Sequence, residues 1–191
     1  MLFKKLVDLC KKRKWIEIIK GDNARWLSDG KVYASLGEDA KLDIADIMYI
    51  MEIPEESEDA FVTSEMEFTE DDMHIFNPKS AEKMDRTHYS LNCDGLTLQP
   101  FGTSQGILFL NTKHTSIFKD TRMKEYYLSE FKGEYIVLVA VDNLTIGMIR
   151  PHRVDLETMK AFSSGFDELI RRAHEKNFLD SGDHQYSLID E

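Results

Sequence analysis

Residues 124–150 read KEYYLSEFKGEYIVLVAVDNLTIGMIR, and this stretch decides the predicted fold. Two dipeptides, Lys132-Gly133 and Asp142-Asn143, separate three apolar runs and are typical of tight turns between antiparallel strands. The stretch is therefore predicted to be a three-stranded antiparallel meander. A two-residue loop at Asp142-Asn143 would place six side chains on one face, in the pairs Val141 with Leu144, Val139 with Ile146, and Val137 with Met148. The opposite face is apolar as well, so we expect another element to cover it.

Three helices are expected to pack on this sheet. The first spans residues 2–13 and has apolar side chains at the spacing of one helical face: Phe3, Leu6, Val7 and Cys10. The second lies near 43–52 with Asp43 as its N-cap, and the third is a long C-terminal helix over 155–177. The predicted fold class is α+β: an antiparallel sheet packed by an N-terminal helix, a helix near 43–52 and a long C-terminal helix.

Other strands are predicted from turn signals and alternation. Asp29-Gly30 indicates a hairpin, and a two-residue loop there would pair Leu27 with Val32 and Trp26 with Tyr33. Residues 61–68, FVTSEMEF, alternate between apolar and polar side chains, which predicts an amphipathic strand with a strongly negative exposed face. No Pro-, Gly- or Ser-rich linker divides the chain, so we expect one domain over 1–180 and a loose tail over 181–191.

The composition is typical of a folded protein without a membrane span. Of the 191 residues, 42% are hydrophobic, and no run approaches the length of about 18 apolar residues that a transmembrane helix needs. The N-terminus lacks the unbroken apolar region and the cleavage site of a signal peptide, so we expect a cytoplasmic protein. Cys10 and Cys93 are the two cysteines, and no CxxC, HxxxH or HExxH spacing occurs. The sequence therefore predicts no metal site and no cofactor.

Charge is distributed unevenly along the chain. The net charge of −11 argues against general nucleic-acid binding. Residues 1–20 hold seven basic side chains against two acids, whereas residues 42–78 hold twelve acids and no lysine or arginine. Such segregation can steer a charged partner. The candidate binding residues are the acids of the second segment: Glu55, Glu56, Glu58, Glu65, Glu67, Glu70, Asp71 and Asp72.

Residues 102–106, GTSQG, match the G-x-S-x-G pattern of serine hydrolases. A catalytic serine of that kind sits where a strand turns sharply into a helix, but the residues after Gly106 form an apolar run that predicts a strand. The pattern therefore indicates a hairpin loop. If it were a nucleophile, Ser104, Asp142 and His152 would be the candidate catalytic residues in chain order.

These observations favour a non-catalytic binding or assembly module that acts through the acidic segment 55–72. Its partner would be a basic protein or the basic N-terminus of another copy of the chain. Two alternatives stay open: a serine hydrolase that uses Ser104, and a clamp-like nucleic-acid accessory protein that is acidic overall and basic along one helix.

Overall fold

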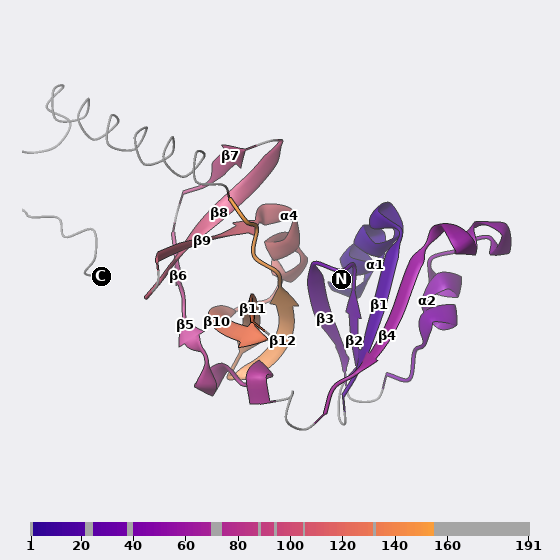
Figure 1. The fold of residues 1–191 in the computed structure, drawn as a ribbon, viewed down its shortest axis with the longest axis horizontal. Coiled ribbons are helices and arrows are strands. Elements are labelled where there is room, and N and C mark those ends of the chain that lie inside the picture. The colour runs from indigo at the N-terminus through magenta and orange to yellow at the C-terminus, as the bar shows by residue number, and fades with distance from the viewer. Residues whose placement is uncertain are drawn as a thin grey trace, which may run out of the picture. The chain divides into compact units, whose positions relative to one another are not determined.

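The computed structural model describes residues 2–21, 25–37, 40–69, 74–87, 89–93, 95–104, 106–131 and 133–154 (Figure 1). One compact unit spans Met1–His152 and contains all the elements discussed below. The predicted α+β class is wrong, because the described chain is mostly β: two sheets, with short helices between and beside their strands. The predicted helix over 155–177 and the tail over 181–191 lie outside the described residues. None of the described helices is long and apolar enough to cross a membrane.

The larger sheet has eight strands in the order β4-β1-β2-β3-β12-β11-β10-β5. Their bounds are β1 Trp15–Lys20, β2 Arg25–Ser28, β3 Val32–Gly37, β4 Val62–Glu67, β5 Glu82–Lys83, β10 Glu125–Phe131, β11 Glu134–Val141 and β12 Leu144–Ile149. The sheet is mixed rather than antiparallel, because β4 runs parallel to β1. Between β3 and β4 the chain passes through α2 (Ile44–Ile50) and η1 (Glu55–Ala60), the kind of crossover that a parallel pair requires.

The smaller sheet is antiparallel and is built around β8. Its strands are β6 Asp85–Arg86, β7 Leu91–Cys93, β8 Leu96–Thr103 and β9 Gly106–Asn111, and β8 pairs with the other three. The hairpin predicted for residues 102–106 is confirmed, since Thr103 pairs with Gly106 across the turn between β8 and β9. Two short helices, α4 (Thr112–Thr115) and η4 (Ser116–Phe118), then lead towards β10.

The predicted meander is confirmed. β10, β11 and β12 pair antiparallel, with two-residue turns at the two predicted dipeptides. The turn residues Gly133, Asp142 and Asn143 have φ angles of 77°, 50° and 64°. This left-handed conformation matches the twist of the flanking strands, which explains why these residue types stand there.

The register predicted for β11 and β12 is wrong beyond the turn, because β12 contains a bulge. Val141 pairs with Leu144 as predicted, but the register then shifts by one residue. The shift turns Met148 to the opposite face and places Gly147 against the buried ring of Phe118. In place of the predicted pairs, the structure has Val139 opposite Gly147 and Val137 opposite Ile149.

The register predicted at Asp29-Gly30 is also wrong. Ser28 pairs with Tyr33, so the turn lies one residue later than predicted. The buried Asp29 side chain explains the shift: its Oδ1 accepts hydrogen bonds from the backbone N–H groups of Lys31 and Val32, both at 2.9 Å. An aspartate that bonds its own turn in this way competes with the simple two-residue loop.

Each face of the larger sheet has its own apolar cluster. The predicted N-terminal helix is confirmed as α1 (Leu2–Arg13), which buries Leu6, Val7 and Cys10 in the first cluster. The predicted second helix is confirmed as α2, with Asp43 accepting from the N–H of Asp46 at 2.9 Å. On the opposite face, where the meander needed a cover, the second cluster is rich in aromatic rings: Trp26, Phe68, Phe76 and Phe131.

Candidate functional site

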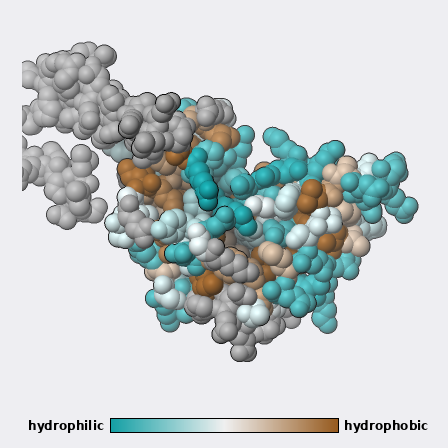
Figure 2. All heavy atoms as spheres, viewed as in Figure 1, coloured by the Kyte–Doolittle hydropathy of each residue, from teal (hydrophilic) through white to brown (hydrophobic). Residues whose placement is uncertain are grey.

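Acidic side chains line the end of the larger sheet that β4 forms. We call Glu55, Glu56, Glu58, Asp59, Glu65 and Glu67, which belong to η1 and β4, the acidic edge. All six side chains are exposed. Figure 1 shows β4 beside β1 as the outermost strand, and in Figure 2 hydrophilic residues cover the corner that η1 occupies. The remaining predicted binding residues, Glu70, Asp71 and Asp72, lie outside the described residues.

The sequence pattern of β4 explains why its acids face solvent. Ser64 and Met66 are half-buried, and Met66 packs against the second apolar cluster, whereas Thr63, Glu65 and Glu67, which alternate with them, are exposed. The predicted alternation is therefore confirmed, with Phe68 as the buried anchor at its end. Val62 departs from the pattern because half of it remains exposed (50%), at the start of the strand.

One ion pair with a cation of the same chain involves the acidic edge. Lys20 of β1 forms an ion pair with Glu65 of β4 at 2.5 Å. Among the residues that the structure describes, no other member of the acidic edge has an ion pair. The acidic edge therefore has several solvent-exposed carboxylates close together, and their charges combine into a negative electrostatic potential at this surface.

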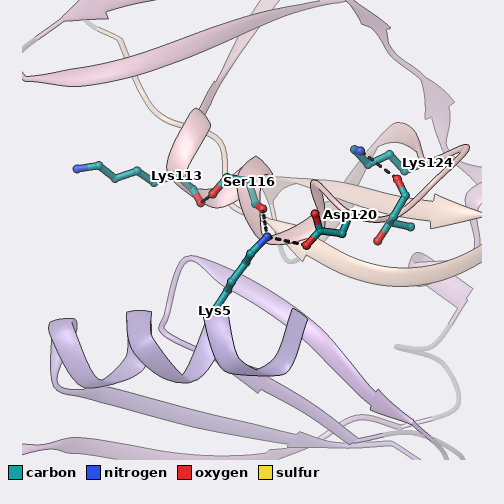
Figure 3. Close-up of polar contacts among 6 residues, drawn as sticks. Lys5, Lys113, Ser116, Asp120 and Lys124 are labelled. Atoms are coloured by element: carbon teal, nitrogen blue, oxygen red, sulfur yellow. Dashed lines mark hydrogen bonds and ion pairs between the residues drawn. The ribbon is translucent and has the colours of Figure 1, made fainter. Parts of the chain in front are cut away.

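The basic residues of α1 are partly used within the fold. Lys5 donates to the carbonyl oxygen of Ser116 at 3.3 Å and to Asp120 at 3.0 Å (Figure 3). This contact lowers the pKa of Asp120, through the hydrogen bond first and the lysine charge second. Lys11 donates to the carbonyl oxygen of Met51 at 2.9 Å. Such contacts tether α1 to its own chain and reduce the positive surface that a phosphate backbone could use.

Ser104, the central residue of GTSQG, lies exposed in the turn between β8 and β9. Its hydroxyl donates to Oε2 of Glu82 at 2.8 Å, and its backbone N–H donates to Oε1 of the same carboxylate. The sequence did not indicate Glu82 as a partner, because 22 residues separate the two. Glu82 also lines a shallow cavity of about 310 Å³, together with Ser129, Glu130 and Tyr135.

The other two residues of the candidate triad occupy different elements. Asp142 stands exposed in the turn between β11 and β12, and His152 forms an isolated backbone bridge with Phe109 of β9. Within the described residues, no hydrogen bond joins either of them to Ser104. The carboxylate of Glu82 is therefore the group placed to accept the proton of Ser104.

A buried polar cluster that no sequence pattern indicated lies at the turn between β2 and β3. Asp29 is fully buried, and its Oδ2 lies 3.6 Å from Nη1 of Arg13. Neither Asp29 Oδ2 nor Nδ1 of His114 has a hydrogen-bond partner among the described residues. Burial lowers the pKa of His114, and the charge of Asp29 opposes this effect. Burial also raises the pKa of the nearby Cys10 thiol, so that this thiol is protonated and not a nucleophile at neutral pH.

The described residues do not form a cluster of metal ligands. In the described ranges, no three histidine, cysteine, aspartate or glutamate side chains converge as metal ligands would. Cys10 is buried in the core and Cys93 is half-buried on β7, and both are free thiols. No family model, curated protein or solved structure matches this chain.

Proposed function

We propose that this chain is a non-catalytic binding module whose acidic edge receives a basic protein partner. The observation that carries the proposal is the position of the acidic edge: exposed carboxylates at the open end of a sheet, with Lys20 as a compensating cation for one of them. The concentration of charge supports a role in attracting a positive surface.

An external partner is better supported than a second copy of the chain. Self-association would have to use the basic N-terminal helix, but Lys5, Lys11 and Arg13 already contact other parts of their own chain. A copy could offer Lys4, Lys12 and Lys14, which are exposed, but not these three cations without breaking their contacts. A separate basic protein is not limited in this way.

The test compares two variants of equal charge. In the first, five acids of the edge become glutamine: Glu55, Glu56, Glu58, Glu65 and Glu67. In the control, five exposed acids elsewhere become asparagine or glutamine: Asp8, Asp85, Glu130, Glu134 and Asp142. Both tagged variants and the wild type are used to capture proteins from the native lysate at low salt, and quantitative mass spectrometry compares the captured proteins.

A partner that the wild type and the control retain, and that the edge variant loses, supports the proposal. Its binding to the wild type should weaken as salt rises from about 0.05 to 0.5 M, because screening shortens the reach of exposed charges. Identical sets of captured proteins for all three forms would contradict the proposal. Sedimentation at low salt tests self-association. If the mass of the wild type doubles and that of the edge variant does not, the acidic edge serves self-association instead.

A second candidate function is hydrolysis that uses Ser104. The observation that favours it is the 2.8 Å hydrogen bond from the Ser104 hydroxyl to Glu82, a carboxylate beside a cavity. A fluorophosphonate probe should then label the wild type once and should not label Ser104→Ala. Absence of labelling in the wild type would exclude a nucleophilic serine of this reactivity.

A further inference from the structure

The backbone of β4 has one satisfied side and one open side. The N–H groups of Val62 and Phe68 donate to the carbonyl oxygens of Lys14 and Lys20, both at 2.9 Å. Even-numbered residues of β4 therefore bond β1, since backbone groups alternate between the two sides of a strand. It follows that Thr63, Glu65 and Glu67 direct their N–H and C=O groups away from the sheet. In the described part of the chain, no strand pairs with that side.

The side chains of the same three residues are exposed. Thr63, Glu65 and Glu67 share one face of the sheet, because side chains alternate with a period of two. The open backbone and the two carboxylates thus coincide, residue by residue. On the other face, the half-exposed Val62 and the half-buried Met66 provide apolar surface.

We propose that β4 binds an extended basic segment of a partner protein as an added strand of the larger sheet. This inference rests on the proposed function of the acidic edge and names the kind of partner. An added strand places its own alternate residues opposite Glu65 and Glu67, on the same face. The segment should therefore carry lysine or arginine at every second position, and apolar residues between them facing Val62 and Met66.

The charge of β4 disfavours a second copy as the occupant in the register centred on Glu65. Two β4 strands paired antiparallel about Glu65 would set that carboxylate directly opposite its symmetry mate. Like charges directly opposite one another destabilise a strand pair. A basic strand replaces this repulsion by attraction to Glu67 and to Glu65, which it would share with Lys20 of β1, so the charge of β4 favours a different chain of opposite charge.

The edge carboxylates also have a competing explanation, which the experiment must separate from binding. Charged side chains on an edge strand protect proteins against sheet-to-sheet aggregation. If this were their role, neutral variants of Glu65 and Glu67 would self-associate, and no peptide would bind the wild type.

The experiment measures binding of a fluorescent alternating lysine–valine peptide, nine residues long, to the full chain by anisotropy. Thr63→Pro removes one outward N–H and keeps every charge, in a position where an edge strand tolerates proline. Thr63→Val is its matched control, since it keeps the N–H. Glu65→Gln/Glu67→Gln removes the charges and keeps the backbone. A peptide with N-methylated alternate residues repeats the backbone test on the wild type, so that the result does not depend on Thr63→Pro folding.

We expect Thr63→Pro and peptide methylation each to weaken binding about tenfold, which corresponds to the loss of one or two hydrogen bonds, with Thr63→Val unchanged. The double glutamine variant should weaken binding by a similar factor. Full binding by Thr63→Pro and by the methylated peptide, with loss in the glutamine variant, would overturn strand addition and leave the acidic edge as a binding surface. If the peptide does not bind the wild type and the glutamine variant self-associates, both strand addition and the binding role of the acidic edge are overturned. The acids would then serve to protect the edge strand against aggregation.

Discussion

Replacing Gly147 with alanine should destabilise the protein strongly, because the ring of Phe118 occupies the place of the new methyl group. An ideal Cβ at Gly147 would lie 2.1 Å from Cζ and 2.3 Å from Cε1 of Phe118. Carbon atoms pack at about 3.5–4.0 Å, so the ring would have to retreat by more than about 1 Å. Phe118 is fully buried, and the carbonyl oxygen of Tyr33 closes another side at 3.0 Å.

The expected loss in the free energy of unfolding is about 3 kcal/mol, the upper end of the usual range for overpacking. Urea unfolding of the full chain, followed by tryptophan fluorescence, measures it. Gly102→Ala is the matched control in β8, because its Cβ would meet its nearest atoms at 3.8 and 3.9 Å, which is ordinary contact. The control should stay within about 0.5 kcal/mol of the wild type.

A double variant shows whether the ring is the cause. Phe118→Leu shortens the side chain, so the cost of Gly147→Ala should fall by at least about 1 kcal/mol in its presence. Equal effects of Gly147→Ala and Gly102→Ala, or additive effects in the double variant, would refute the close packing of Phe118 on Gly147 and the bulge that creates it.

Three further predictions concern single sites. The pKa of His114 is lowered by burial, so the unfolded chain takes up this proton first as the pH falls below about 6.5. The stability contribution of neutral His114 is therefore full above that pH and is lost as the pH falls through the lowered pKa. Urea unfolding at pH 8 and pH 5.5 should show a smaller decrease in the free energy of unfolding for His114→Gln than for the wild type. Equal decreases would contradict this reasoning. The buried hydroxyl of Thr145 donates to the carbonyl oxygen of Phe76 at 2.5 Å, so Thr145→Val should lower the unfolding free energy by about 1–2 kcal/mol in a urea titration, whereas Thr145→Ser, which keeps the hydroxyl, should retain this hydrogen bond. Gly133→Ala should lower the free energy of unfolding by about 1 kcal/mol in thermal unfolding, since φ is +77° and no atom lies within 4 Å of the added Cβ. Gly133→Asn should cost less, because asparagine tolerates this conformation. An alanine variant as stable as the wild type would argue against the turn.

The elements predicted correctly are those whose signals are local. The turn dipeptides of the meander, the apolar face of α1 and the capping aspartate of α2 all act over a few residues. The downstream apolar run of GTSQG likewise predicted the hairpin between β8 and β9. In each case the residues that determine the backbone conformation are neighbours in the chain, so that their interactions are the same in any fold.

The errors have long-range causes. The predicted antiparallel sheet is mixed in the structure because β4 pairs in parallel with β1, whose paired residues lie 47 positions earlier in the chain. No local pattern encodes that pairing. The bulge in β12 brings Gly147 against the ring of Phe118, which belongs to a different element, and the turn after β2 coincides with the burial of Asp29. Such contacts decide register only once distant segments have met.

For the candidate site the division is similar. The sequence alone determined that acids concentrate between β3 and the second half of the chain, and that those of β4 share one face, because composition and a period of two are properties of the chain itself. Only the tertiary structure decided that β4 stands at the end of the sheet, with Thr63, Glu65 and Glu67 directing their backbone outwards. The physical reason is that a strand's alternation sets its two faces locally, whereas its neighbours, and therefore its open side, are set by hydrogen bonds to strands that lie far away in the sequence.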